Sequence, residues 1–455
     1  MADPNQRSRE SVILWISVIL FGLFGAQTAF QLYRAHGMRL DVNADLSAEL
    51  ADATIIEEKL APPSAGWPQW RGPHRDGVVH APDLLTDWPR NGPATLWHKT
   101  IGIGYSSFAV KDGWAYTLFS DGEYEVVVCW DVKNGEERWR HSYECAYSPQ
   151  FPGPRSTPTL DGDRLYTVGT AGTFLCLNAK TGKQLWQHEL LGEFNAATPK
   201  WGVTFSPLID DDLVFTNPGG RNGHSLAAFN KNSGELVWNA LDDLAGYSSP
   251  IAVTIGDVRQ IVFLTANHLV GVRAKDGELC WRFPWNTSFE VNAATPLAFQ
   301  ARKDGKVLDY VFISSGYDKG CALVKIASLG DGKFEAKKVY QGNQLRSHFA
   351  SPVRRGAYLF GLDEARLICM DLRTGEVKWS RSGFNKGSLL LVDDYLLVLG
   401  ENGDLALIEA SNEEKSPTAT ARPFRNRCWT LPALAEGRLF LRAEEKVKCL
   451  DLRKK

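Results

Sequence analysis

A nine-residue motif that recurs along the chain constrains the fold more than any other feature of the sequence. It consists of a polar or charged residue, two variable positions, a small polar residue followed by glycine, three more variable positions and tryptophan. Five clear copies occupy 131–139, 178–186, 230–238, 273–281 and 371–379. The polar–glycine pair predicts a tight hairpin in which both residues adopt positive backbone dihedral angles, and the flanking residues alternate as strands do.

The tryptophans that end these motifs are regularly spaced. From Trp139 onward they lie 47, 52 and 43 positions apart, and the interval from Trp281 to Trp379 is 98, or twice 49. A period of this length is typical of a stacked repeat. Two degenerate repeats complete the series, one at about 292–341 and one at 386–424. In these the turn is replaced by 329–332 and by 410–413.

The last repeat is split between the two ends of the sequence. Another turn begins at 449–453, and the tryptophan strand that it requires is found at 94–100, around Trp97. A ring that closes with strands from both ends has no exposed sheet edge at the junction. Five clear, two degenerate and one split repeat predict an all-β, eight-bladed β-propeller over 66–455. A seven-bladed ring is the alternative if one degenerate segment is an insertion.

Most repeats begin with a small residue before proline, followed by an apolar alternation, as at 156–158 and 205–207. Proline at the start of a strand removes no ladder hydrogen bond, so we expect these residues to begin the innermost strand of each blade. The motif tryptophans are expected in outer strands, where burial of each ring contributes roughly 1.5–3 kcal/mol or more. These structural tryptophans are Trp97, Trp139, Trp186, Trp238, Trp281 and Trp379.

The turn closely resembles the tryptophan-docking motif of the pyrroloquinoline quinone (PQQ) propeller repeats. In that family the tryptophan packs against the backbone of the adjacent blade. The resemblance covers about residue 66 to the C-terminus and implies one of two branches. Quinoprotein dehydrogenases hold the quinone and calcium in the channel, whereas BamB-like assembly factors and many PQQ-like repeat proteins are non-catalytic. The segment WPQWRGPHRDG at 67–77 is similar to the opening segment of PQQ-like repeat proteins whose role is unassigned.

The resemblance also implies what an enzyme of this family requires. Quinoprotein dehydrogenases typically carry a disulfide between adjacent cysteines, calcium ligands from a carboxylate and an amide, and an aspartate base. No two of the eight cysteines are adjacent, and the nine histidines lack metal-ligand spacing. We therefore predict no catalytic residue, no metal ligand and no cofactor, and a scaffold that binds a protein partner. A PQQ- and calcium-dependent oxidoreductase and a carbohydrate- or small-ligand-binding propeller are the alternatives.

Alignment of the repeats predicts one binding surface. The position three residues before each inner-strand proline, or its equivalent, should lie at a similar height around the channel. We call these eight positions the channel mouth: Tyr105, Arg155, Thr204, Tyr247, Ala293, Phe349, Lys386 and Trp429. Four aromatic and two cationic side chains would suit an anionic or aromatic partner, or a peptide segment. The alternative interpretation is a ring of ordinary loop and strand-start residues.

Four cysteines share one repeat position, two residues before the motif begins. Equivalent positions in different blades should be too far apart for a disulfide, so we interpret these residues as small, buried and apolar. They are Cys129, Cys176, Cys369 and Cys449, and other blades have Ala228 and Gly271 there. The sequence leaves open whether a disulfide joins any of Cys145, Cys280, Cys321 and Cys428.

The N-terminal region predicts a membrane anchor. After a short tail at 1–10, the apolar run at 11–30 is bounded by arginines and is long enough to span a bilayer; a cleaved signal segment is the alternative. Residues 31–65 are predicted to be a linker, interpreted as a solvated tether, although 45–52 could form a short amphipathic helix.

We expect the propeller on the extracytoplasmic, periplasmic side of a membrane, with an envelope protein as its partner. This placement rests on the resemblance and on the short N-terminal tail. The formal net charge is −2, and no basic stripe is present. The charge pattern therefore does not favour nucleic acid as a partner.

Overall fold

The computed structural model describes residues 40–454 apart from 58, 59, 63 and 65. One compact unit begins at Val42 and continues to the end of the chain. The predicted tail at 1–10 and membrane anchor at 11–30 lie outside the described residues. Within the described part, no helix is both long and apolar enough to span a bilayer.

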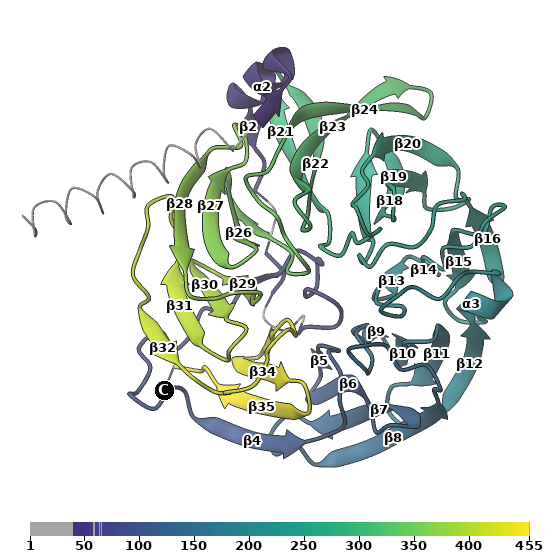
Figure 1. The fold of residues 1–455 in the computed structure, drawn as a ribbon, viewed down its shortest axis with the longest axis vertical. Coiled ribbons are helices and arrows are strands. Elements are labelled where there is room, and N and C mark those ends of the chain that lie inside the picture. The colour runs from purple at the N-terminus through teal and green to yellow at the C-terminus, as the bar shows by residue number, and fades with distance from the viewer. Residues whose placement is uncertain (1–39, 58–59, 63, 65, 455) are drawn as a thin grey trace, which may run out of the picture. The chain divides into compact units, whose positions relative to one another are not determined.

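Eight sheets are arranged around a central axis, which confirms the all-β, eight-bladed propeller (Figure 1). Six of the sheets have four strands, one has five and one has six. Four blades, from the inner to the outer strand, are β5 (Ala109–Lys111), β6 (Trp114–Ser120), β7 (Tyr124–Asp131) and β8 (Glu137–Glu144); β9 (Thr159–Asp161), β10 (Arg164–Val168), β11 (Thr173–Asn178) and β12 (Gln184–Glu189); β13 (Leu208–Asp210), β14 (Leu213–Thr216), β15 (Leu226–Asn230) and β16 (Leu236–Ala240); and β17 (Ile251–Ile255), β18 (Val258–Leu264), β19 (His268–Arg273) and β20 (Leu279–Pro284).

The other four blades follow the same pattern. They are β21 (Leu297–Lys303), β22 (Lys306–Ser315), β23 (Gly320–Gly330) and β24 (Lys333–Gly342); β25 (Val353–Arg355), β26 (Tyr358–Asp363), β27 (Arg366–Asp371) and β28 (Val377–Ser382); β29 (Ser388–Val392), β30 (Tyr395–Leu399), β31 (Leu405–Glu409) and β32 (Ala419–Ala421); and β33 (Ala433–Ala435), β34 (Arg438–Ala443), β35 (Lys446–Asp451) and β4 (Thr95–Thr100). A short helix, α3 (Leu190–Glu193), follows β12.

The split blade forms as predicted. The outer strand β4 pairs antiparallel with β35, and Trp97 lies opposite Cys449 in the register. The two ends of the propeller therefore share one sheet. Both degenerate repeats also form blades, although the outer strand of one, β32, has only three residues.

The hairpin turns confirm the motif but correct its backbone geometry. In the first copy the amide of Gly135 donates to the carbonyl of Asp131 at 2.8 Å, and the Asp131 side chain accepts from the amide of Lys133. The glycine alone has a positive φ, +72° at Gly135, whereas Asn134 does not. The prediction that both residues of the pair adopt positive dihedrals was wrong, because Asn134 shapes the turn with its side chain instead, which accepts a hydrogen bond from the amide of Glu136.

Four of the turn glycines, Gly135, Gly182, Gly234 and Gly277, also form the docking surface for the tryptophan of the preceding blade. Nε1 of Trp97 donates to the carbonyl of Val132 at 3.0 Å, and Nε1 of Trp139 donates to that of Ala179 at 2.9 Å. A β-carbon added to Gly135 would lie 2.8 Å from the Trp97 ring. The motif therefore requires glycine at this position for two reasons, its positive φ and the close approach of an indole.

The same interblade bond recurs around the ring with three departures, one of which is the blade that ends in β32 (Ala419–Ala421), a strand without a tryptophan. Trp186, Trp238 and Trp379 donate to the carbonyls of the next blade at Lys231, Ala274 and Ser411. In the degenerate blade that ends in β24, the hydroxyl of Tyr340 replaces the indole and donates to the carbonyl of Leu372. Trp281 precedes that degenerate blade and donates within its own blade to Gln260.

The shared cysteine position is explained by the strand register. Cys129, Cys176, Cys369 and Cys449 each lie opposite the docking tryptophan on the adjacent strand, as do Ala228 and Gly271. These four cysteines are buried, and all eight carry free thiols. A small residue at this position leaves room for the indole to lie across its own blade.

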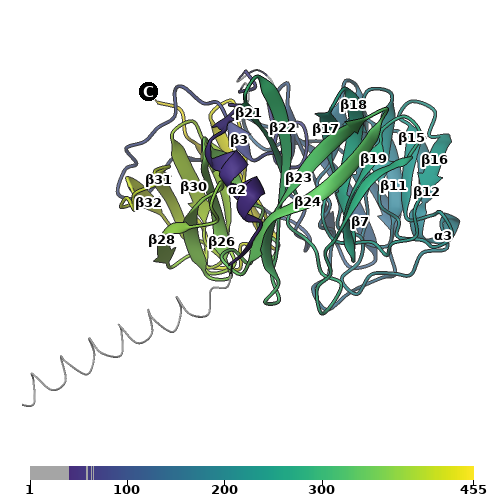
Figure 2. The same cartoon turned by 90° about the horizontal axis from the view of Figure 1, so that it is seen from above.

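The predicted linker is structured where it is described. Asn43 caps α2 (Ala44–Ala51), whose Leu50 is fully buried, and β2 (Thr54–Ile55) pairs with β21. The strand β1 (Leu40–Val42) pairs with β24 in the same six-stranded sheet. Figures 1 and 2 both show α2 beside this blade. The short amphipathic helix is confirmed, whereas the solvated tether was wrong for this stretch because an apolar face is buried and Lys325 pairs with Glu49.

Substitution of Gly271 by alanine tests the tryptophan register. The new β-carbon would lie 2.7 Å from Cζ2 of Trp281, so we expect a loss of about 1–3 kcal/mol in the free energy of unfolding, measured in urea. Gly192→Ala in α3 is the matched control, because nothing lies within 4 Å of that position and its φ is not positive. Equal stability of the two variants would contradict the proposed packing.

Candidate functional site

A collar of hydroxyl groups joins the inner strands at their starting ends. In three neighbouring pairs the residue before proline donates its amide to the equivalent hydroxyl of the next blade: Thr157 to Ser206, Ser206 to Ser249, and Thr295 to Ser351, at 2.8–2.9 Å. This role of the small polar residue was not predicted, although its recurrence before proline was visible in the sequence. These hydrogen bonds hold the strand starts of neighbouring blades at one height along the axis, and the channel-mouth residues lie just before them in the sequence.

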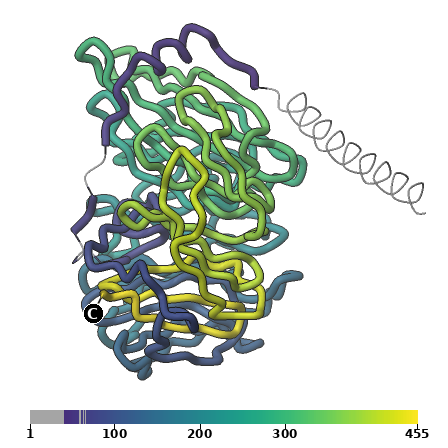
Figure 3. Tube along the Cα trace, turned by 90° about the vertical axis from the view of Figure 1, so that its left-hand side faces the viewer, coloured from purple at the N-terminus to yellow at the C-terminus, as the bar shows by residue number. Residues whose placement is uncertain are grey.

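The chain's own N-terminal segment crosses the axis beneath this collar. We call residues 66–77 the axial plug. Its main chain bonds to the inner strands at Val110, Leu160 and Leu391, and the exposed fraction of Trp67 is 0%. In the edge-on view of Figure 3 the purple N-terminal part of the propeller follows one side of the ring before the chain enters the blades.

Two buried arginines anchor the plug through carbonyl groups. The guanidinium of Arg71 donates to the carbonyls of Ser351 and Pro352, and that of Arg75 donates to those of Ser206 and Pro207, at 2.6–3.0 Å. Burial lowers the pKa of Arg71 to about 10 and that of Arg75 to about 9. Both remain charged at neutral pH. Their hydrogen bonds to these carbonyls therefore offset much of the free-energy cost of burying two cations.

The channel mouth lies on the other side of the collar, and the structure brings most of its predicted residues together. All eight positions are partly exposed, whereas the inner-strand residues that follow them are largely buried. Trp429 is central: its ring centroid lies 5.8 Å from Tyr105 and 5.6 Å from Phe349. Phe151, which the repeat alignment missed because it lies in a loop of irregular length, is 5.1 Å from Trp429.

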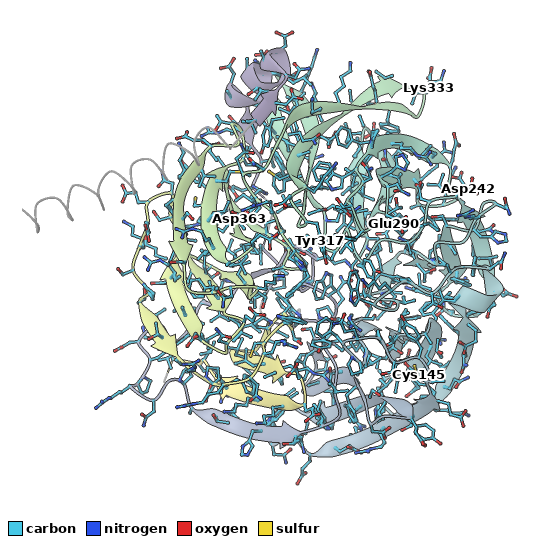
Figure 4. All side chains as sticks on the ribbon, in the orientation of Figure 1. Cys145, Asp242, Glu290, Tyr317, Lys333 and Asp363 are labelled. Atoms are coloured by element: carbon cyan, nitrogen blue, oxygen red, sulfur yellow. The ribbon has the colours of Figure 1, made fainter. Side chains whose placement is uncertain are left out.

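The aromatic contacts continue across the mouth into neighbouring blades. Phe349 contacts His348, His348 contacts Tyr317 at 4.8 Å, and Tyr317 contacts Phe289 at 5.3 Å. Figure 4 shows Tyr317 near the centre of the ring and Lys333 at its perimeter. We call this chain of rings the aromatic band: Phe289, Tyr317, His348, Phe349, Trp429, Tyr105 and Phe151. The exposed fraction of Phe289 is 62%.

Cations cover one end of the aromatic band. The guanidinium of Arg155 lies 5.3 Å from the Tyr105 ring, and that of Arg427 lies 4.4 Å from Trp429. Arg427 was missed because it lies two residues before the aligned position. Burial lowers the pKa of Arg155, which is held by the carbonyls of Phe151 and Gly153. The site therefore combines flat apolar surface with fixed positive charge.

The remaining mouth residues are less closely joined to this band. The hydroxyl of Thr204 donates to the carbonyl of Tyr247, whose ring contacts Trp201 at 5.6 Å. Lys386 lies near His348 and lowers its pKa. Ala293 contributes only a small surface. The predicted set is thus a half-ring of aromatic and cationic groups rather than a uniform circle.

The residues at the axis do not fit a quinone with calcium. Among the described residues, no three histidine, cysteine or acidic side chains are grouped so that they could hold a metal ion. The polar groups that the axial plug brings to the inner strands are the guanidinium donors of Arg71 and Arg75, which repel a cation, and they already bond to carbonyls. What the mouth exposes beyond these bonded donors is ring faces and the guanidinium groups of Arg155 and Arg427.

The fold and the site together define a closed ring of tryptophan-docked blades with a plugged axis. A family model described as outer membrane protein assembly factor BamB matches residues 123–381, which is more than half of the chain. The chain therefore belongs to this family, and the resemblance to PQQ-like propeller repeats is confirmed.

Relatives from both branches of the family match in sequence. BamB of Shewanella oneidensis is 24% identical over 258 residues, covering 53% of this chain and 62% of that protein. The quinohemoprotein alcohol dehydrogenase ADH IIB of Pseudomonas putida is 27% identical over 134 residues, covering 28% of this chain and 18% of the enzyme. The matches thus span less than two thirds of either relative.

Solved structures show the same fold. BamB from Moraxella catarrhalis superposes with a TM-score of 0.51 at 14% identity, over 78% of this chain and 98% of that one. The quinohemoprotein alcohol dehydrogenase ADHIIG from Pseudomonas putida HK5 gives a TM-score of 0.60 at 10% identity, over 90% and 82%. Because both branches share the architecture, the fold alone does not distinguish their functions.

Burial in the aromatic band makes His348 an acid-sensitive residue. Desolvation and the nearby Lys386 lower its pKa from 6.5 to about 4. Between those values the unfolded chain binds more protons than the folded one, so stability is lost as the pH falls through this window. We expect His348→Phe to reduce the loss of stability between pH 7 and pH 4.5 by about 1 kcal/mol, after allowance for partial exposure.

Urea unfolding at the two pH values measures this difference. His98→Phe, on the exposed face of β4, is the control and should follow the wild type. An acid sensitivity that is identical in all three proteins would show that His348 is not the residue responsible.

Proposed function

We propose that this protein is a non-catalytic scaffold of the cell envelope, anchored in a membrane by residues 11–30, whose channel mouth docks a partner protein. The observation that carries the proposal is the pairing of an aromatic band with a plugged axis. An enzyme of this fold would need an open channel behind the mouth, lined by side chains that hold the cofactor and its metal ion. Here that space holds Arg71 and Arg75 with their carbonyl partners.

The composition of the mouth supports a protein partner. Interface hot spots are enriched in tryptophan, tyrosine and arginine, and they cluster at the centre of the contact. Trp429, Tyr105, Arg155 and Arg427 form such a cluster, and Phe289 extends an exposed ring toward it through Tyr317. Membership of a family described by an outer-membrane assembly factor supports an envelope setting.

Site-specific photo-crosslinking in the native host tests the mouth. A photoreactive residue in place of Phe289 should give a discrete crosslinked product with an envelope protein, and the additional substitution Trp429→Ala should reduce its yield at least tenfold. Loss of a central tryptophan typically weakens an interface by about 2 kcal/mol or more, which is roughly thirtyfold in affinity.

A photoreactive residue at Lys333 is the control, because this residue lies at the perimeter of the ring (Figure 4). It should give no such product. Equal products from both positions, or an unchanged product in the Trp429→Ala background, would contradict docking at the mouth.

Membrane attachment is tested separately with a chain that lacks residues 1–30 but is exported by a cleavable signal. The full-length protein should remain in the membrane fraction after washing with high salt and alkaline carbonate, because an apolar segment of this length partitions into the bilayer. The shortened protein should be soluble. Recovery of the full-length chain in the soluble periplasmic fraction would instead support a cleaved signal segment.

A further inference from the structure

One inner strand with a long free edge lies on the plugged side of the ring. The N-terminal chain covers several other inner edges: β2 pairs with β21, β3 (Val78–Val79) pairs with β29, and Trp67 bridges to Val110 of β5. Among the described residues, β17 has five residues and pairs only with β18. In the part of the chain that the structure describes, the N-terminal segment makes no main-chain hydrogen bond to it.

The hairpin that ends β17 determines which groups its free edge presents. Gly256 and Asp257 form the two-residue turn, both with positive φ, and Ile255 pairs with Val258. In an antiparallel ladder alternate residues direct their amide and carbonyl away from the partner strand. Ala252 and Thr254 therefore present main-chain donors and acceptors on the inner edge. The side chain of Ala252 is half-buried and that of Thr254 is exposed.

A groove of about 950 Å³ runs along this edge. All five residues of β17 line one wall, and Ala298 and Gln300 of β21 with Asp309 of β22 line the facing wall. This volume lies at the upper end of the range for ligand sites, about 300–1,000 Å³. A strand that pairs with β17 would lie roughly 4.8 Å from it. The groove occupies this position, because all five residues of β17 line it.

Among the described residues, Asp309 is a carboxylate of the groove that forms no ion pair. Its side chain accepts a hydrogen bond from the amide of Gln300 at 2.8 Å, and burial raises its pKa. Other charged residues of the lining are already bonded: Arg259, Arg355, His80 and Arg354 form ion pairs with Asp210, Asp394, Asp393 and Glu57, and Arg71 and Arg75 donate to main-chain carbonyls. A basic side chain that enters the groove would therefore pair with Asp309.

We propose that this groove binds an extended peptide segment of a partner protein, which adds a strand to the inner edge of β17 and places a lysine or arginine against Asp309. The chain itself shows the mode of binding, because β2 and β3 add to β21 and β29 in the same way. Main-chain hydrogen bonds would supply affinity, and the half-buried Val253 with Asp309 would supply selectivity. This site is independent of the channel mouth.

Fluorescence anisotropy with a labelled synthetic peptide, Thr-Val-Lys-Val-Thr-Val, tests the proposal on the folded propeller. The peptide should bind, and a version with glutamate in place of lysine should bind at least tenfold more weakly. Asp309→Asn should abolish most of this difference. The Trp429→Ala variant should bind the lysine peptide as the wild type does, which separates this site from the mouth.

The strand-addition step is tested by removing one main-chain donor on either side. Ala252→Pro deletes an outward amide without breaking the ladder to β18, and N-methylation of alternate peptide amides does the same on the ligand, so that the protein stays unchanged. Each should weaken binding at least tenfold. Absence of binding by the lysine peptide, equal binding of both peptides, or tight binding of the N-methylated peptide would overturn the proposal.

Discussion

The docking of an indole onto the turn of the next blade is the interaction on which the ring depends. Each contact joins one hydrogen bond, worth about 0.5–1.5 kcal/mol, to burial of a large ring. The glycine of the turn and the small residue opposite the tryptophan are both consequences of where that ring lies, as Gly135 and Cys449 show around Trp97. Because five blades donate an indole hydrogen bond to the next blade and a sixth donates the hydroxyl of Tyr340, the core of each of these blades is completed by a neighbour.

The axial plug solves a different physical problem. Eight inner strands that converge on an axis direct main-chain carbonyls at their starting ends into a narrow space, where unpaired groups would be costly. Arg71 and Arg75 supply several donors each on rigid planar groups, and they bond to carbonyls before β13 and β25. A protein with a polar cofactor at its axis could satisfy such groups with the ligand. This chain satisfies them with its own side chains, and so it separates the two faces of the ring.

Repetition determines how much of this structure the sequence predicts. The blades, the docking tryptophans and the closure at Trp97 were predictable because each is present in several copies. The plug was not, because WPQWRGPHRDG occurs once and its arginines bond to main-chain carbonyls that carry no sequence signature. The helix α2 was underestimated for a similar reason: only Leu50 is fully buried, so its apolar face is short. At the mouth, Phe151 and Arg427 lie off the aligned positions, and only the folded loops bring them to Trp429.

The plug also relates the two candidate surfaces to each other. The channel mouth lies before the inner-strand prolines, and the β17 groove is lined by residues after them, with Arg75 between the two at Ser206 and Pro207. Thr204 is only two residues from Ser206 and bonds to Tyr247 of the mouth. The plug is fixed to the ring by main-chain hydrogen bonds at Val110, Leu160 and Leu391. Partners on the two faces would therefore bind on opposite sides of the plug, which is an arrangement that lets a scaffold hold two chains at once.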